Sequence, residues 1–175
     1  DPTHKHRPTM SYALDVSPEA RSCAIAASDG VHHEVVKHQP GTGWVVEACV
    51  AKRDAFTEIV LDPAGPAGQL VAPLEAAGLK VRKLSTEEAK AACARFLTGV
   101  TDGTMRHIGQ PELDRAVVNA DRRDVGDGGW LWSRLRSSVD ISPLVACTWA
   151  GFVAGATRPS TAPGFINLED FLDEE

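Results

Sequence analysis

The sequence lacks the features that assign a chain to the membrane or to covalent catalysis. No apolar run in its 175 residues approaches the roughly 20 residues that a membrane-spanning helix requires. The longest such run, at 143–155, is short and rich in small residues, and it predicts a buried helix. There is no glycine-flanked serine elbow and no plausible cysteine–histidine pair. We therefore expect neither membrane insertion nor a covalent intermediate.

Cysteine is scarce and widely spaced. The chain has four cysteines and no CxxC pair: Cys23, Cys49, Cys93 and Cys147. Each lies in an apolar or helical context, which is typical of reduced, buried thiols in a cytosolic protein. Three histidines, His32, His33 and His38, fall on one expected strand, where adjacent residues face opposite sides. The spacing therefore favours neither a disulfide framework nor a zinc site.

Positive charge is also in short supply. The chain has 18 Lys and Arg against 24 Asp and Glu, a net charge of −6. This balance argues against a general polyanion-binding surface but is compatible with a local basic patch beside an acidic, metal-binding site. Each basic residue taken singly is typical of a solvated face. The residues that we expect to contact DNA phosphates as a group are Lys80, Arg82, Lys83, Arg122, Arg123, Arg134 and Arg136.

The order of the expected elements indicates an α/β fold with a mixed sheet. Alternating apolar residues predict strands at 11–17, 21–28, 31–39, 58–62, 80–84 and 128–134, and the Asp-Gly pair at 29–30 predicts a hairpin. Helical spacing predicts helices at 43–56, 68–78, 85–100, 110–123 and 140–155. The helix at 85–100 opens with a capping box formed by Ser85 and Glu88. Three antiparallel strands followed by alternating helices and strands are typical of a ribonuclease-H-like sheet flanked by helices.

Three aspartates fall on elements that such a fold brings together. Asp15 lies within the first expected strand, Asp62 ends the fourth, and Asp140 opens the last helix. The first and fourth strands are expected to be parallel neighbours, so the two strand carboxylates can meet. Clustered carboxylates bind hard divalent cations such as Mg²⁺, and two such ions activate water and stabilise the leaving oxygen in phosphodiester hydrolysis. The pattern predicts a two-metal hydrolytic site.

Each aspartate also has a simpler explanation. Asp62 precedes Pro63 and can initiate a turn. Asp140 can be an acid favoured at a helix N-terminus. Asp15 is harder to explain away, because an acid within an apolar strand is costly unless it is paired or bound to a metal.

Several segments resemble the nuclease domain of the large terminase subunit of tailed phages or prophages. They are SYALDVSPEARSCAIAAS, IVLDPAGPAG, RHIGQPELDRAV and WLWSRLRSSVDISPLVACTWA, and the resemblance covers roughly residues 10 to 155. It implies a ribonuclease-H-like, metal-dependent endonuclease that cuts concatemeric viral DNA during packaging, with Asp15, Asp62 and Asp140 as catalytic metal ligands. Asp124 and Asp127 are alternates for the third acid.

The resemblance also implies cofactors, partners and a location. The cofactors are two Mg²⁺ or Mn²⁺ ions, and the location is the cytoplasm of an infected or lysogenic bacterium. The partners are double-stranded DNA, the terminase ATPase domain, the small terminase subunit and the portal, with no membrane. The chain has no GxxxxGK[ST] phosphate loop, so it resembles the nuclease half alone.

We therefore expect three segments and keep two alternative functions. Residues 1–10 are expected to be a tag or linker remnant, 11–157 the nuclease domain, and 158–175 an acidic, loosely structured tail. One alternative is a non-catalytic docking module that holds the portal or DNA. The other is a different ribonuclease-H-like nuclease, such as a junction resolvase.

Overall fold

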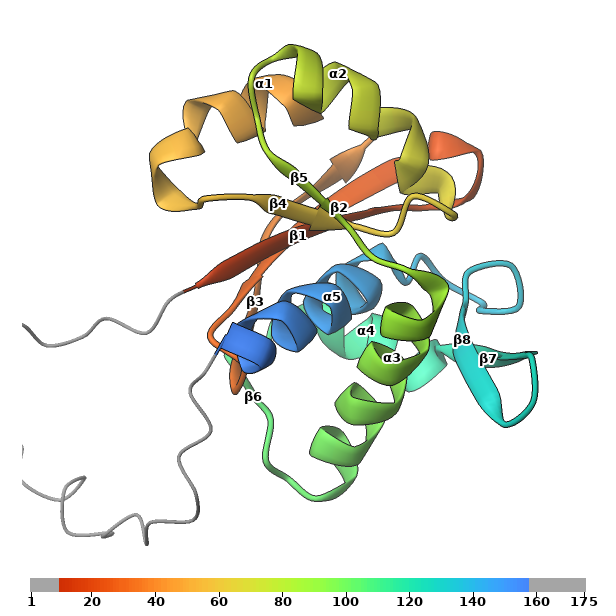
Figure 1. Cartoon of the computed structure of the whole chain (residues 1–175). Coiled ribbons are helices and arrows are strands. Elements are labelled where there is room, and N and C mark those ends of the chain that lie inside the picture. Colours follow the sequence, from red (N-terminus) through yellow and green to blue (C-terminus); the bar gives the residue numbers. More distant parts are fainter. Residues whose placement is uncertain (1–9, 158–175) are drawn as a thin grey trace, which may run out of the picture.

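The computed structural model describes residues 10–157, which form a sheet between two layers of helices (Figure 1). The main sheet contains six strands: β1 (Ser11–Val16), β2 (Ser22–Ser28), β3 (His32–Pro40), β4 (Ile59–Leu61), β5 (Val81–Lys83) and β6 (Arg106–His107). Their order across the sheet is β5-β4-β1-β2-β3-β6. β1, β2 and β3 form an antiparallel meander, while β4 and β6 run parallel to β1 and β3, and β5 runs parallel to β4.

Helices cover both faces of this sheet. The α-helices are α1 (Val45–Ala51), α2 (Val71–Ala76), α3 (Thr86–Thr101), α4 (Pro111–Asn119) and α5 (Ser142–Thr157). Short 3-10 helices occur at η1 (Pro18–Ala20), η2 (Arg53–Ala55) and η3 (Pro66–Leu70). α1 and α2 cover one face, and α3, α4 and α5 cover the other, with α5 against the central strands (Figure 1).

The alternation of β1 divides the core in two. Leu14 and Val16 pack in the cluster beneath α1 and α2. Ala13 packs in the other cluster, together with Trp149 of α5. Because successive side chains of a strand point to opposite faces, Asp15 lies on the α5 side with Ala13. The strand therefore delivers one carboxylate into the layer between the sheet and α5.

The predicted element order is confirmed in its main features. The antiparallel meander is present, and Gly30, with φ of +98°, makes the predicted turn between β2 and β3. β1 and β4 are parallel neighbours, as expected. α3 begins with the predicted capping box, in which Ser85 Oγ accepts from the Glu88 backbone N–H and Glu88 accepts from that of Ser85.

The helix expected at 110–123 is confirmed up to Asn119 and wrong beyond it. α4 ends at Asn119, whose side chain donates to the Arg115 carbonyl oxygen. The chain then forms a separate hairpin of β7 (Asp121–Val125) and β8 (Gly129–Ser133). The helix ends because Ala120 is already extended, with ψ of 134°, and the turn of the hairpin contains Gly126 and Gly128, both with positive φ. The edge strand β6 was also not predicted.

Other expectations concern the cysteines, the membrane and the chain ends. All four cysteines are free and buried, as expected. Within residues 10–157, no helix has the length and apolarity needed to cross a membrane. The expectations for residues 1–9 and for the tail at 158–175 lie outside the described residues.

Candidate metal centre

Asp15 is the deepest of the predicted site residues. Its side chain is completely buried on the α5 face of β1, the strand between β4 and β2 at the middle of the sheet. Arg134 binds it with two hydrogen bonds: Nη2 donates to Oδ1 at 2.6 Å and Nε donates to Oδ2 at 3.0 Å. The paired geometry is the strong, bidentate form of the arginine–carboxylate interaction. The buried charge of Asp15 is therefore compensated by an ion pair with Arg134.

Arg134 reaches this position from the loop that follows β8. Its side chain is 14% exposed, and its guanidinium lies against Gly65, where a Cβ atom would come within 3.2 Å of Nη2. The turn after β4 therefore leaves room for the guanidinium because it has no side chain at this position. Burial acts to lower the pKa of Arg134, but the adjacent Asp15 carboxylate outweighs it and raises the pKa. The guanidinium is thus held charged beside the acid.

Asp62 follows β4 directly and lies level with Asp15. The register pairs Ala13 with Val60, so two further residues along each strand bring the two aspartates to the same edge. Asp62 is 6% exposed, and its Oδ1 accepts the Ala64 backbone N–H at 2.9 Å. Burial raises the pKa of Asp15, Arg134 counteracts the rise, and the Asp62 charge adds to it. Asp62 is therefore both a turn-forming residue and an electrostatic neighbour of Asp15.

Asp140 is held by a different set of partners. Its Oδ2 accepts from His38 Nε2 at 2.8 Å and from the Ser22 hydroxyl, and its Oδ1 accepts the Ser142 N–H at 2.9 Å. Burial acts to raise the pKa of Asp140, but the hydrogen bonds from His38 and Ser22 outweigh it and lower the pKa. The carboxylate is thus kept ionised at the N-terminal end of α5.

A surface pocket joins the two parts of this region. Arg134 and Asp140 both line it, and its volume is about 360 Å³. Carboxylate oxygens suit a hard divalent ion, and Asp15 already holds one cationic group, the guanidinium of Arg134. Within the described part of the chain, however, no group of three or more His, Cys, Asp or Glu side chains is placed to hold a metal ion. The carboxylate oxygens are suitable ligands for a divalent ion, but Asp15, Asp62 and Asp140 do not surround a single position in this structure.

The remaining predicted residues lie elsewhere. Asp124 lies on β7, paired in register with Trp130, and Asp127 lies in the hairpin turn, and both are exposed. They belong to the separate two-stranded sheet rather than to the edge that carries Asp15. Their role as alternates for the third acid stays a prediction.

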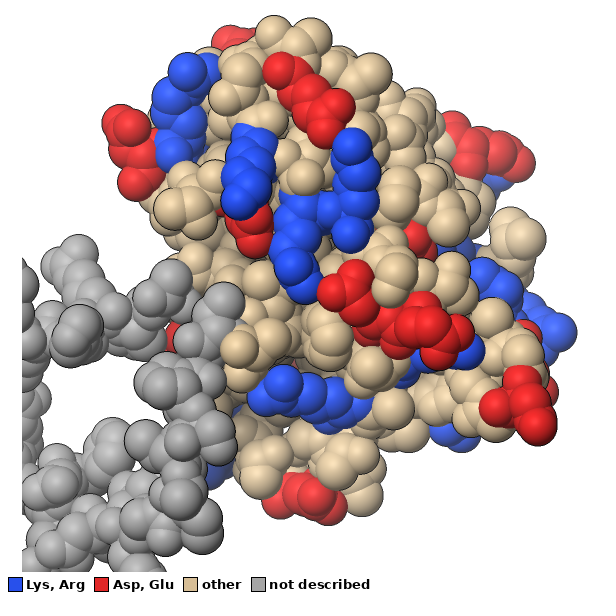
Figure 2. Space-filling view, viewed as in Figure 1, with Lys and Arg blue, Asp and Glu red and all other residues tan. Residues whose placement is uncertain are grey.

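The predicted basic residues are dispersed. Arg134 is committed to Asp15, Lys83 pairs with Glu75 at 2.9 Å, and Arg82 pairs with Glu88 at 2.9 Å. Arg122 lies over the Trp130 ring, and Arg136 donates to the Arg122 carbonyl oxygen. Lys80 pairs with Glu58 at 3.1 Å, and Arg123 is exposed. On the face in Figure 2, basic and acidic side chains are interleaved. Contact of these residues with DNA stays a prediction.

Sequence reasoning missed three partners of the acids. It took Arg134 for a DNA contact and His38 for an exposed strand residue, and it did not consider Ser22. The only hint of these partners in the sequence was the register of the antiparallel strands. Asp15 pairs with Ala24 of β2, and Ala24 pairs with His38 of β3. A separation of 119 residues between Arg134 and Asp15 leaves no local pattern to find.

Comparison with solved structures gives the fold. The chain superposes on the large terminase nuclease from thermophilic phage G20c with a TM-score of 0.62, 14% identity and 82% of each chain covered. It matches the HK97 bacteriophage large terminase with a TM-score of 0.60 and 18% identity, covering 84% of this chain and 40% of that one. It also matches a K428A mutant nuclease domain of the large terminase subunit gp2 of bacterial virus Sf6, solved with manganese, with a TM-score of 0.51, 17% identity, and 86% and 89% covered.

The fold is that of a large terminase nuclease domain. The predicted ribonuclease-H-like class is therefore confirmed. No protein-family model matches the sequence, and no curated protein matches it. The three structures are 14 to 18% identical to this chain, so the likeness shows the fold alone. The functional site has to be argued from the residues of this chain.

Proposed function

We propose that the chain is a divalent-metal-dependent endonuclease that cuts double-stranded DNA, with concatemeric viral DNA as its substrate during genome packaging. The observation that carries this proposal is the placement of Asp15, a fully buried carboxylate level with Asp62 at the edge of two parallel strands. A buried acid beside a second acid is costly, and such sites are more often functional than structural. Structures with the same fold are of nuclease domains, some with bound magnesium, cobalt or manganese, and this supports the proposal.

Asp15 and Asp62 would hold the metal, with Asp140 as the third ligand. A bound divalent pair supplies an activated water and stabilises the leaving oxygen in phosphodiester hydrolysis. In the absence of metal, Arg134 balances the charge of Asp15. His38 and Ser22 orient the Asp140 carboxylate and keep it ionised, as a ligand must be. DNA, the packaging ATPase, the small subunit and the portal are the proposed partners, and the bacterial cytoplasm is the proposed location.

Plasmid nicking by the purified chain tests this function. We expect supercoiled DNA to be nicked in Mg²⁺ or Mn²⁺ without ATP, and the activity to disappear with excess chelator. Asp15→Asn should reduce nicking by about two orders of magnitude or more, since the substitution removes the ligand charge but keeps its shape. Asp54→Asn, at an exposed acid of η2, is the matched control and should retain the parental rate. Nicking that survives chelation, or an Asp15→Asn variant that cuts at the parental rate, would refute the assignment.

A non-catalytic docking module is the second candidate. Two observations favour it. Arg134 already neutralises Asp15, and within the described residues no three acids lie close enough together to hold a metal ion. A docking module would bind DNA or portal and leave plasmid intact in every divalent metal. A junction resolvase would instead cut branched DNA in preference to linear duplex.

A further inference from the structure

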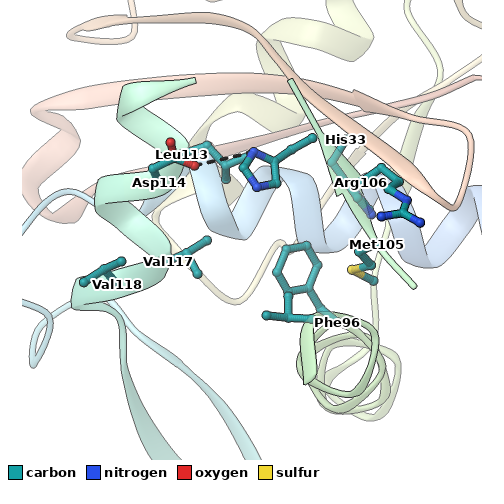
Figure 3. A pocket seen from close by; sticks show the side chains of 10 residues that line it. His33, Phe96, Met105, Arg106, Leu113, Asp114, Val117 and Val118 are labelled. Atoms are coloured by element: carbon teal, nitrogen blue, oxygen red, sulfur yellow. Dashed lines mark ion pairs between the residues drawn. The ribbon is translucent and has the colours of Figure 1, made fainter. Parts of the chain in front are cut away.

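A second pocket lies between α3, α4 and β6. Its volume is about 310 Å³, and apolar side chains of α3 and α4 converge on it (Figure 3). Phe96 and Leu113 form buried parts of its wall, and Val117 and Met105 lie at its opening. The pocket shares none of its lining with the Arg134–Asp140 pocket.

Exposed apolar side chains gather around this pocket. Of the six large apolar residues exposed in the described part of the chain, three line it: Val100 (45% exposed), Val117 (37%) and Val118 (82%). A fourth, Ile108 (73%), directly follows His107 of the lining. Scattered exposed apolar residues are ordinary, whereas a concentrated apolar patch marks an interaction surface. We call this surface the α3–α4 groove.

The rim of the α3–α4 groove is basic on the side nearest the end of α5. Arg106 lines the groove, and Met105 is shared with a neighbouring pocket of about 350 Å³. That neighbouring pocket is lined by Arg95 and by Gly155, two residues before the last residue of α5. A continuous surface with two arginines thus leads from the end of α5 to the groove.

The chain that follows α5 has matching chemistry. Residues 158–175 lie outside the described part of the structure, and their sequence includes FINLEDFL at 165–172. Phe165, Leu168 and Phe171 recur at intervals of three, a spacing that places them on one side of a helix. From 165 to 175 the chain has five acids and no Lys or Arg. An apolar stripe flanked by acids complements an apolar groove whose rim carries Arg106, and the one acid of the groove lining, Asp114, lies 3.4 Å from His107.

The connection starts close to the groove, because Gly155 lines the pocket that shares Met105 with it. Phe165 lies eight residues after Thr157, and eight steps of about 3.3 Å span at most roughly 26 Å. A tethered segment also needs little intrinsic affinity, because its effective concentration is in the millimolar range. We propose that residues 165–172 bind the α3–α4 groove of the same chain through Phe165, Leu168 and Phe171.

Hydrogen–deuterium exchange of the full chain tests this proposal. Two variants each disrupt one partner of the proposed contact: Val118→Asp in the groove and Phe171→Asp in the 165–172 segment. Val118 is 82% exposed, so its substitution should leave the core intact, and Leu135→Asp, at an 86% exposed position outside the groove, is the matched control. We expect amides of 165–172 to exchange at least about tenfold more slowly than an unstructured peptide in the parent and the control. Both groove and segment variants should lose this protection, and the double variant should lose nothing more.

Three outcomes would overturn the proposal. One is exchange of 165–172 at the unstructured rate in the parent chain. Another is protection that Val118→Asp leaves unchanged. The third is protection that disappears on about fiftyfold dilution, which would assign the groove to a second copy of the chain by mass action. Because no readout involves nicking, failure here is distinguishable from failure of the proposed nuclease function.

Discussion

Two N–H groups of Arg134 bind the two oxygens of Asp15, and the acid has no contact with solvent. Burying such a pair costs desolvation free energy. The attraction between the two charges offsets this cost only when the hydrogen-bond geometry is good, as it is here. Under the function proposed above, the Arg134 guanidinium would supply the positive charge that Asp15 needs when no metal is bound.

Replacing Arg134 with Gln should therefore destabilise the metal-free protein. The Asp15 carboxylate would remain buried without a counter-charge, a defect that typically costs about 3 to 5 kcal/mol. Arg136→Gln, two residues along and exposed, should change the free energy of unfolding by less than about 0.5 kcal/mol. Urea denaturation measures both values.

Saturating Mn²⁺ separates a cation site from a merely structural ion pair. If the acids form a metal centre, Mn²⁺ should restore much of the stability that Arg134→Gln loses, because the ion replaces the missing charge. A loss below about 1 kcal/mol in Arg134→Gln, or equal effects of Mn²⁺ on both variants, would contradict this account.

At the scale of elements, the start of α3 offers a clean test of local stability. Ser85 Oγ accepts the Glu88 N–H at 3.1 Å, so its removal leaves an N-terminal donor of the helix without a partner. Ser85→Ala should cost about 1 kcal/mol, whereas Ser85→Gly should cost only a few tenths. Thermal or chemical denaturation of the two variants measures the difference, and equal costs would show that the cap is not what stabilises this end.

The strand β3 contributes a pH dependence through His33. Its side chain is 3% exposed and meets the Phe96 ring edge to face, and burial lowers the pKa of His33 to about 4. The unfolded chain takes up a proton near pH 6.5, well before the folded chain does. Stability from the neutral ring is thus complete above that pH and falls as the pH drops toward 4. Between about pH 7 and pH 5 the free energy of unfolding should decrease by about 2 kcal/mol.

His33→Leu should flatten this part of the pH profile, since leucine does not titrate. His32→Gln, at the exposed neighbour, should leave the slope intact. Denaturant titrations at several pH values measure the slopes. A parental slope in His33→Leu would assign the acid sensitivity to other groups.

Elements with a strong local signal were the ones that the sequence predicted well. Asp15 and Asp62 could be placed at one edge because β4 is a short, fully apolar strand and β1 and β4 were expected to be parallel neighbours. Of the β7–β8 hairpin, β8 was predicted at 128–134, whereas β7 was missed because its polar sequence, Asp121–Val125, continues the composition of α4. Its stabilising contact, Arg122 over Trp130, crosses the hairpin and is not visible in a local pattern.

The partners of the acids could not be predicted, for a different reason. Ser22, His38 and Arg134 reach Asp140 and Asp15 only through the assembled sheet and its loops. The separations are 118, 102 and 119 residues. Such contacts depend on the final topology, and the residues themselves are ordinary polar positions in the sequence.

At the scale of the whole molecule, net charge and salt bridges limit the interaction with DNA. The chain carries −6, and Lys83, Arg82 and Arg134 are already paired with acids. We expect weak binding with little sequence preference. With three or four phosphate contacts, affinity should fall by about two orders of magnitude between about 50 and 200 mM salt.

Fluorescence anisotropy with unrelated duplexes, in Ca²⁺ to prevent cleavage, measures this binding. Arg123→Gln should weaken it on every sequence alike, whereas Arg53→Gln, at an exposed arginine near α1, is the control. Nanomolar binding at about 150 mM salt, or about a tenfold preference for one unrelated sequence, would reveal a recognition surface that this account lacks.

Anomalous diffraction from a crystal soaked in Mn²⁺ tests the central claim most directly, because manganese scatters anomalously and protein atoms at the site do not. The account predicts manganese bound to the Asp15 and Asp62 carboxylates, with Arg134 displaced from Asp15 and Asp140 drawn to the same centre. An intact Arg134–Asp15 pair at saturating Mn²⁺, with no anomalous peak at either aspartate, would contradict the metal centre and with it the proposed nuclease.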